Sequence, residues 1–226
     1  MAGQTEPRTE RRGRARLSRE RVLRAAVTLA DEGGIDTLSM RRLAKELGVE
    51  AMSLYNHVAN KDDILDGIVD IVMGEIEIPS NDTDWKASIR QSAISAHEAL
   101  VRHPWACSLM MAKARVSNAR MLWMEGVLRT LREAGFSANM THHAYHALDS
   151  HITGFTLWLV SMPFESKEEL VDLAEGFLRE IPADEYPYVV EHAHQHLEPA
   201  SPDGKTEFEF GLDLILDGLE QLRDPA

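Results

Sequence analysis

Long apolar segments and cysteines are nearly missing from this 226-residue chain. No apolar run approaches the ~18–20 residues that a membrane-spanning helix needs. The charged N-terminus also lacks the apolar core of a secretion signal. The single cysteine, Cys107, excludes an intramolecular disulfide and suits a reducing compartment. We therefore expect a cytoplasmic protein with no membrane partner.

Signatures of catalysis are missing as well. The sequence has no glycine-rich phosphate loop, no nucleophile elbow and no cysteine–histidine pattern. Cys107 stands between Ala106 and Ser108, where a small buried residue is the simplest interpretation. We expect no enzyme activity, no catalytic residues and no cofactor.

Positive charge is scarce in the chain as a whole, whose net charge is −13, but it is concentrated at one end. Residues 1–61 carry 12 Lys and Arg against 8 Asp and Glu, whereas residues 62–226 carry 12 against 29. Because phosphates repel an acidic surface, only the N-terminal end is suited to approach DNA. Residues 1–16 contain five arginines and almost nothing apolar, which predicts a disordered basic arm. This arm either solubilises the chain or contacts phosphates or the minor groove.

The stretch Leu38–Lys61 has the pattern of two short helices joined by a tight turn. Ser39 can cap the first helix, and Gly48 can adopt the positive φ that a sharp turn needs. The second helix is expected to start near Glu50. The residues expected to point inward are Leu43, Ala44, Leu47, Val49, Leu54 and Val58. This is the helix-turn-helix pattern, whose second helix enters the major groove of DNA.

Short motifs in this region add to the pattern. They are, in order, Leu47-Gly48-Val49, Leu54-Tyr55, His57-Val58, Asn60-Lys61 and Ile64-Leu65-Asp66. With these motifs, the segment from about Leu17 to about Gly67 resembles the DNA-binding part of the tetracycline-repressor (TetR) family of bacterial regulators. The remainder is similar mainly in its all-helical layout, and in the stretch Glu133-Ala134-Gly135-Phe136. The resemblance implies an all-α homodimer that binds a palindromic operator, usually to repress, and that is released by a small molecule.

By that resemblance, seven residues occupy positions that the family uses on DNA. They are Arg41, Met52, Ser53, Tyr55, Asn56, His57 and Lys61. Arg41 could bind guanine through two hydrogen bonds, Asn56 could read adenine, and Met52 could touch a thymine methyl group. The other four are better suited to phosphate contacts. The alternative is that all seven are merely exposed residues of a small helical bundle.

We expect a basic arm (1–16), a helix-turn-helix domain (17–62) and a helical effector-binding and dimerisation domain (63–226). A first helix capped by Ser18 should end at Gly33-Gly34, and a fourth helix, 61–77, capped by Asn60, should connect the two domains. A polar linker, Pro79 to Asp84, should follow. The body shows no period-2 strand, and its predicted helices are 84–102, 104–111, 117–134, 138–161, 166–180, 185–197 and 206–222.

Two of these helices carry apolar seams with alternating steps of three and four residues, which is typical of helices packed at shallow angles. The seam residues are Tyr145, Leu148, Ile152, Phe155 and Leu159 in one helix, and Phe208, Leu212, Ile215 and Leu219 in the other. An intrachain core is one interpretation. By the resemblance, we hypothesise instead that both seams form the homodimer interface.

The body also contains an aromatic and methionine-rich set whose simplest role is core packing. Because the family buries an effector pocket in this body, we hypothesise a pocket for an apolar or aromatic ligand. Its predicted wall is Trp105, Met110, Trp123, His146, Ser150, Gly154 and Trp158.

Histidines spaced four residues apart, His142 with His146 and His192 with His196, could each supply half of a metal site. Two ligands do not make a site, so we predict no metal. A helical metal- or small-molecule-binding protein that does not act on DNA is nevertheless the alternative from another class. A regulator that acts only through a protein partner is a third interpretation.

Overall fold

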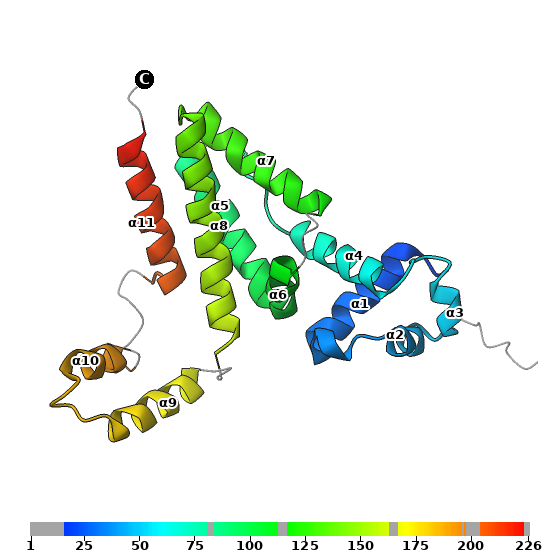
Figure 1. Cartoon of the computed structure of the whole chain (residues 1–226), viewed down its shortest axis with the longest axis horizontal. Coiled ribbons are helices and arrows are strands. Elements are labelled where there is room, and N and C mark those ends of the chain that lie inside the picture. Colours follow the sequence, from blue (N-terminus) through cyan, green and yellow to red (C-terminus); the bar gives the residue numbers. More distant parts are fainter. Residues whose placement is uncertain are drawn as a thin grey trace, which may run out of the picture. The chain divides into compact units, whose positions relative to one another are not determined.

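The chain folds into helices that divide into two compact units, Met1–Ile68 and Val69–Ala226. The computed structural model describes residues 16–80, 84–112, 117–162, 167–195, 197 and 204–223. Within these ranges there are eleven α-helices and one short 3₁₀ helix, and no strand (Figure 1). The predicted all-α fold is confirmed. None of the helices in the described ranges combines the length and the apolar character needed to cross a membrane.

The first unit begins with α1 (Arg19–Gly33), the 3₁₀ helix η1 (Ile35–Thr37), α2 (Met40–Leu47) and α3 (Ala51–Leu54). Side chains of Ser18 and Ser39 accept hydrogen bonds from the first turns of α1 and α2, as predicted. Gly48 has φ 64° and its N–H bonds to carbonyls of α2, so the chain turns sharply into α3. The unit's small core includes Val22, Ala26, Leu29, Leu38, Leu43, Leu54, Val58 and Ile64.

Helix α4 (Lys61–Met73) begins in the first unit and ends in the second. The Asn60 side chain accepts the N–H of Asp63 at 2.8 Å, which is the predicted cap. A Cβ on Gly67 would lie 2.7 Å from the side chain of Leu23, so this glycine lets α4 approach α1 closely. The prediction that the helix continues to residue 77 is wrong. The N–H of Gly74 is shared between two carbonyls at 3.0 Å, which tightens the last turn and ends the helix.

The second unit is a bundle built around α5 (Trp85–Arg102), which packs against α6 (Pro104–Ala112), α7 (Asn118–Glu133), α8 (Ala138–Val160) and α11 (Glu207–Leu222). Figure 1 shows α5, α8 and α11 running side by side. Helices α9 (Lys167–Glu180) and α10 (Pro187–Gln195) pack mainly on each other. The predicted helices of the body agree with these bounds to within a few residues.

Helix α11 is fastened to α5 and α8 by ion pairs and by stacked rings. Arg90 of α5 reaches Glu209 at 2.9 Å and Asp213 at 2.7 Å. Phe208 is stacked between two histidine rings, with centroids 4.0 Å from His97 and 4.9 Å from His151. The docking of α11 therefore belongs to the fold of a single chain.

This packing corrects the predicted interface. The residues buried within the chain are Tyr145, Leu148, Ile152, Phe208, Leu212 and Leu219. They cannot also touch a second copy, because neighbouring helices of the same chain already cover them. Phe155, Leu159 and Ile215 are half-buried, and Leu216 takes the buried place expected for Ile215. Six of the nine seam residues are therefore core of the single chain, whereas a place in the interface stays a prediction for the three half-buried ones.

Candidate DNA-reading surface and ligand cavity

The segment from the end of α2 through α3 leaves several side chains exposed to solvent. Leu54 is completely buried and anchors α3, while Met52 is 76% exposed and Tyr55 is 48% exposed. Helix α3 ends at Leu54 and is followed by a turn, in which the N–H of His57 donates to the Leu54 carbonyl at 2.8 Å. This geometry holds one face of α3 in the core and turns the other face outward.

All seven residues predicted to contact DNA belong to the first unit, and none of them is buried. Arg41 is exposed on α2, Lys61 is exposed at the start of α4, and the others lie on α3 and the turn after it. Asn56 is exposed, whereas Ser53 and His57 are partly exposed. Of the arginines of the predicted arm, only Arg16 falls in the described part of the chain.

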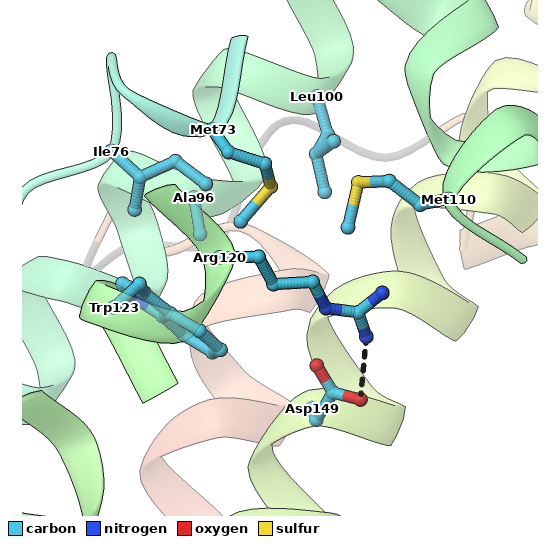
Figure 2. A pocket seen from close by; sticks show the side chains of 8 residues that line it. All are labelled: Met73, Ile76, Ala96, Leu100, Met110, Arg120, Trp123 and Asp149. Carbon is cyan, nitrogen blue, oxygen red and sulfur yellow. Dashed lines mark ion pairs between the residues drawn. The ribbon is translucent and has the colours of Figure 1, made fainter. Parts of the chain in front are cut away.

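A cavity in the second unit has a mostly apolar wall and one charged edge (Figure 2). The free space within it is close to that of a single water molecule, and the cavity is partly open to solvent. Its lining residues are Met73, Ile76, Ala96, Leu100, Met110, Arg120, Trp123 and Asp149. The nearest charged atoms of Arg120 and Asp149 are 3.6 Å apart.

The cavity wall is bonded to the segment that follows α4. The indole N–H of Trp123 donates to Ser92 Oγ at 3.0 Å, and the Ser92 hydroxyl donates to the Glu77 carbonyl at 2.6 Å. The Glu77 N–H donates to Ser95 Oγ at 3.0 Å. The carboxylate of Asp70, in α4, accepts the N–H of Ala119 at the start of α7 at 2.9 Å. These hydrogen bonds connect the cavity wall to the last turns of α4 and to the segment that follows it.

The structure does not bring the seven predicted pocket residues together. Met110 and Trp123 line the cavity, and Trp105 is buried without lining it. The other four, which are His146, Ser150, Gly154 and Trp158, lie on exposed faces of α8. At this cavity α8 contributes Asp149 and none of these four residues, so their place in a pocket wall stays a prediction. Arg120 and Asp149 were missed because nothing local in the sequence pairs one helix with another.

The histidines and the cysteine offer no second site in the described residues. His142 and His146 have ring centroids 4.6 Å apart, but no three potential metal ligands of the described chain lie close enough to hold an ion. His196 lies outside the described residues. Cys107 is buried, and this burial raises the pKa of its thiol to about 11, so the thiol is protonated at neutral pH.

These features define a helix-turn-helix protein whose second unit is a helical bundle with a small, largely apolar cavity. Comparison with known families agrees with that class. Residues 22–68 match the model of the bacterial regulatory proteins of the tetR family, and residues 78–223 match the tetracyclin repressor-like C-terminal domain. The chain belongs to the TetR family of bacterial transcriptional regulators.

Individual relatives cover nearly the whole chain. The transcriptional repressor DrrR1 of Streptomyces coeruleorubidus is 32% identical, over 96% of this chain and 83% of its own length. The class D tetracycline repressor of Escherichia coli is also 32% identical, over 91% of this chain and 90% of its own. The structure of ActR from Streptomyces coelicolor bound to (S)-DNPA is 29% identical, with a TM-score of 0.73 over 92% of this chain and 98% of that one.

Proposed function

We propose that this protein is a homodimeric repressor that binds a two-half-site operator through α3 and is released when a small molecule occupies the cavity of its body. It would act in the bacterial cytoplasm, where the chromosome lies. The observation that carries the proposal is the pairing of an outward-facing α3 with a cavity whose wall is bonded to the end of α4.

The DNA-binding half is supported by the chemistry of the exposed surface. Met52 and Tyr55 place apolar and aromatic groups where a groove could receive them, and Asn56 offers a side-chain amide. Arg41 and Lys61 flank them with positive charge. Within the first unit, α2 packs against both α1 and α3 (Figure 1). A related TetR-like structure, BioQ with its operator DNA, is 25% identical with a TM-score of 0.64.

Dimerisation is supported by the outer faces of α8 and α11. Three large apolar residues of α11 are more than half exposed: Phe210, Leu214 and Leu222. Added Cβ atoms on Gly154 of α8 and Gly218 of α11 would meet nothing within 4 Å, so both outer faces have room for a close neighbour. We propose that these faces, and not the buried seams, pair with their twofold mates. Such pairing would set two α3 helices about 34–36 Å apart, one turn of DNA.

Effector release is supported by the position of α4. Met73, the last residue of this helix, lines the cavity, and Lys61, its first residue, lies at the DNA-reading surface. A ligand changes operator affinity only if it binds the two states of the protein unequally. A molecule that pushes Met73 and Trp123 apart would change operator affinity in this way. Met73 is the last residue of α4, and Trp123 is hydrogen-bonded through Ser92 to the segment that follows α4.

Selection of bound DNA from a random library at physiological salt tests the proposal. We expect a palindromic motif that is lost in Tyr55→Ala and kept in Tyr188→Ala, which removes an 82% exposed tyrosine from α10. Loss of a base contact should weaken binding by about 1–3 kcal/mol. Only weak, salt-sensitive and sequence-blind binding by the unaltered protein would contradict operator recognition.

A further inference from the structure

The cavity of the body is apolar everywhere except at one edge. Of its eight lining residues, only Arg120 of α7 and Asp149 of α8 carry charge. Their side chains retain 24% and 22% of their full exposure, so both charges are largely withdrawn from water. A charge in such a place interacts more strongly with a ligand than the same charge on the surface.

The contact between these two residues is loose. The Arg120 Nη2 to Asp149 Oδ2 distance is 3.6 Å, which exceeds a hydrogen bond. Arg90 contacts Asp213 at 2.7 Å in the same bundle. Figure 2 shows the guanidinium of Arg120 between Met110 and Asp149, with one terminal nitrogen turned toward Asp149 and the other turned away. The guanidinium also hydrogen-bonds the Tyr145 hydroxyl of α8, and because it carries five N–H donors, these two partners leave N–H groups for a further acceptor.

A guanidinium can serve two carboxylates at once, since its five N–H donors form a planar fork. Arg90 does so in this structure, through Nε to Asp213 and through Nη2 to Glu209. Arg120 can likewise bind a second acid while it stays beside Asp149. A ligand cation would instead have to draw Asp149 away from Arg120 and would lie next to the guanidinium charge.

The rest of the wall selects for shape. The indole of Trp123 presents a flat face that an aromatic ring can contact, and the flexible side chains of Met73 and Met110 can adapt to the edge of such a ring. The free space is close to that of a single water molecule, far less than an aromatic ligand needs, so binding requires the side chains of Met73 and Met110 to move.

We propose that this cavity recognises flat, largely apolar molecules that carry one carboxylate-like acidic group, and that Arg120 binds this group. The inference deepens the proposed function, because it names the chemical class of the effector. A preference for the acid would also distinguish binding at this site from nonspecific binding of apolar molecules. With a net charge of −13, the chain repels anions at long range, so a preference for the acid has to arise locally.

A matched pair of fluorescent probes tests the proposal on the full-length protein near neutral pH. Anthracene-2-carboxylate is anionic, and anthracene-2-carboxamide has nearly the same shape but no charge. Binding is followed by the fluorescence anisotropy of the probe. We expect the acid to bind at least about tenfold more tightly than the amide, as a charge-assisted pair in a partly buried site allows.

Variants assign the preference to one side chain. Arg120→Met should reduce the acid-to-amide preference to within about twofold, while Arg129→Met, an exposed arginine on the same helix, should leave it unchanged. Met110→Trp should fill the cavity and weaken both probes. Circular dichroism checks that each variant is folded. If a variant fails to fold, the ratio of acid to amide affinity of the unaltered protein still tests the proposal.

Several outcomes would overturn the inference. The amide binding as tightly as the acid would do so, as would equal losses in Arg120→Met and Arg129→Met. Absence of binding by both probes up to about 1 mM would also do so. None of these measurements involves DNA. Failure here would therefore leave operator binding untouched, and failure to select an operator would leave the ligand chemistry of the cavity untouched.

Discussion

Arg19 and Asp63 join α1 to α4 through two hydrogen bonds of 2.7 Å each, one from each terminal nitrogen of the guanidinium. The Asp63 carboxylate also accepts the N–H of Ala59 at 2.8 Å. These contacts, with the Arg19 hydrogen bond as the largest cause, lower the pKa of Asp63 to about 2. The pair holds α1 against the start of α4 within the first unit.

Arg19→Met should lower the free energy of unfolding at neutral pH by about 1 kcal/mol, because a two-point pair is lost but Arg19 is half exposed. The folded pKa of Asp63 lies below its unfolded value of about 3.9. The stabilisation is therefore complete above about pH 5 and fades as the pH falls toward 2. Urea unfolding across this range checks both points. Arg24→Met, which removes a pair whose side chains are over 70% exposed, should change little.

Ser92→Ala should uncouple the cavity wall from the segment after α4. It leaves the buried indole N–H of Trp123 and the Glu77 carbonyl without their hydroxyl partner, which should cost about 1–3 kcal/mol of unfolding free energy. Ser95→Ala removes a single bond at a partly exposed site and should cost less. Urea unfolding ranks the two variants. Equal losses of unfolding free energy in the two variants would contradict a special contribution of the buried hydrogen bonds of Ser92.

Leu214→Glu should convert the dimer into a monomer. Leu214 is 59% exposed on α11, and in a twofold pair the substitution places like charges near each other in an apolar contact. Sedimentation should show a particle of twice the 25.4 kDa chain mass for the unaltered protein, and of one chain mass for the variant at micromolar concentration. Leu173→Glu, at a 51% exposed leucine of α9, is the control and should remain dimeric. A monomeric unaltered protein would refute the interface.

His97 should make the body less stable in mild acid. Burial lowers the pKa of His97, and the nearby His151 lowers it further. Because the folded pKa lies below the unfolded value of about 6.5, stability is complete above that pH and is lost as the pH falls through the folded pKa. One proton changes the unfolding free energy by at most about 1.4 kcal/mol per pH unit.

His97→Phe should flatten this pH dependence between about pH 7.5 and pH 5.5, since a phenyl ring can keep the stacking on Phe208 but cannot be protonated. Chemical unfolding at a series of pH values measures the slope. His143→Phe, at an exposed position of α8, should leave the slope as it is. A slope that survives His97→Phe unchanged would assign the acid sensitivity to other groups.

Much of the helix layout follows from local chemistry. Ser18, Ser39 and Asn60 each accept a hydrogen bond from the first turn that follows them, so the sequence alone locates three helix starts. Gly48 marks the turn in the same way, because its positive φ is unfavourable for residues with a side chain. The all-α fold and the outward residues of α3 were predictable for this reason.

The partner of each apolar face was not predictable. The alternating spacing of Leu148 and Ile152 correctly groups them on one face of α8, but spacing is the same whether the covering helix belongs to the same chain or to another. In the structure α8 packs against α5 and α11, and both Leu148 and Ile152 are buried within the single chain.

The sequence by itself determined where the helices begin, which of their faces are apolar and which end of the chain can approach DNA, because these depend on neighbouring residues and on net charge. Only the tertiary structure decided that Arg120 and Asp149 meet at one cavity and that Trp123 is linked through Ser92 to Glu77. These contacts join segments far apart in the chain, and their distances arise from how whole helices pack, which no local pattern encodes.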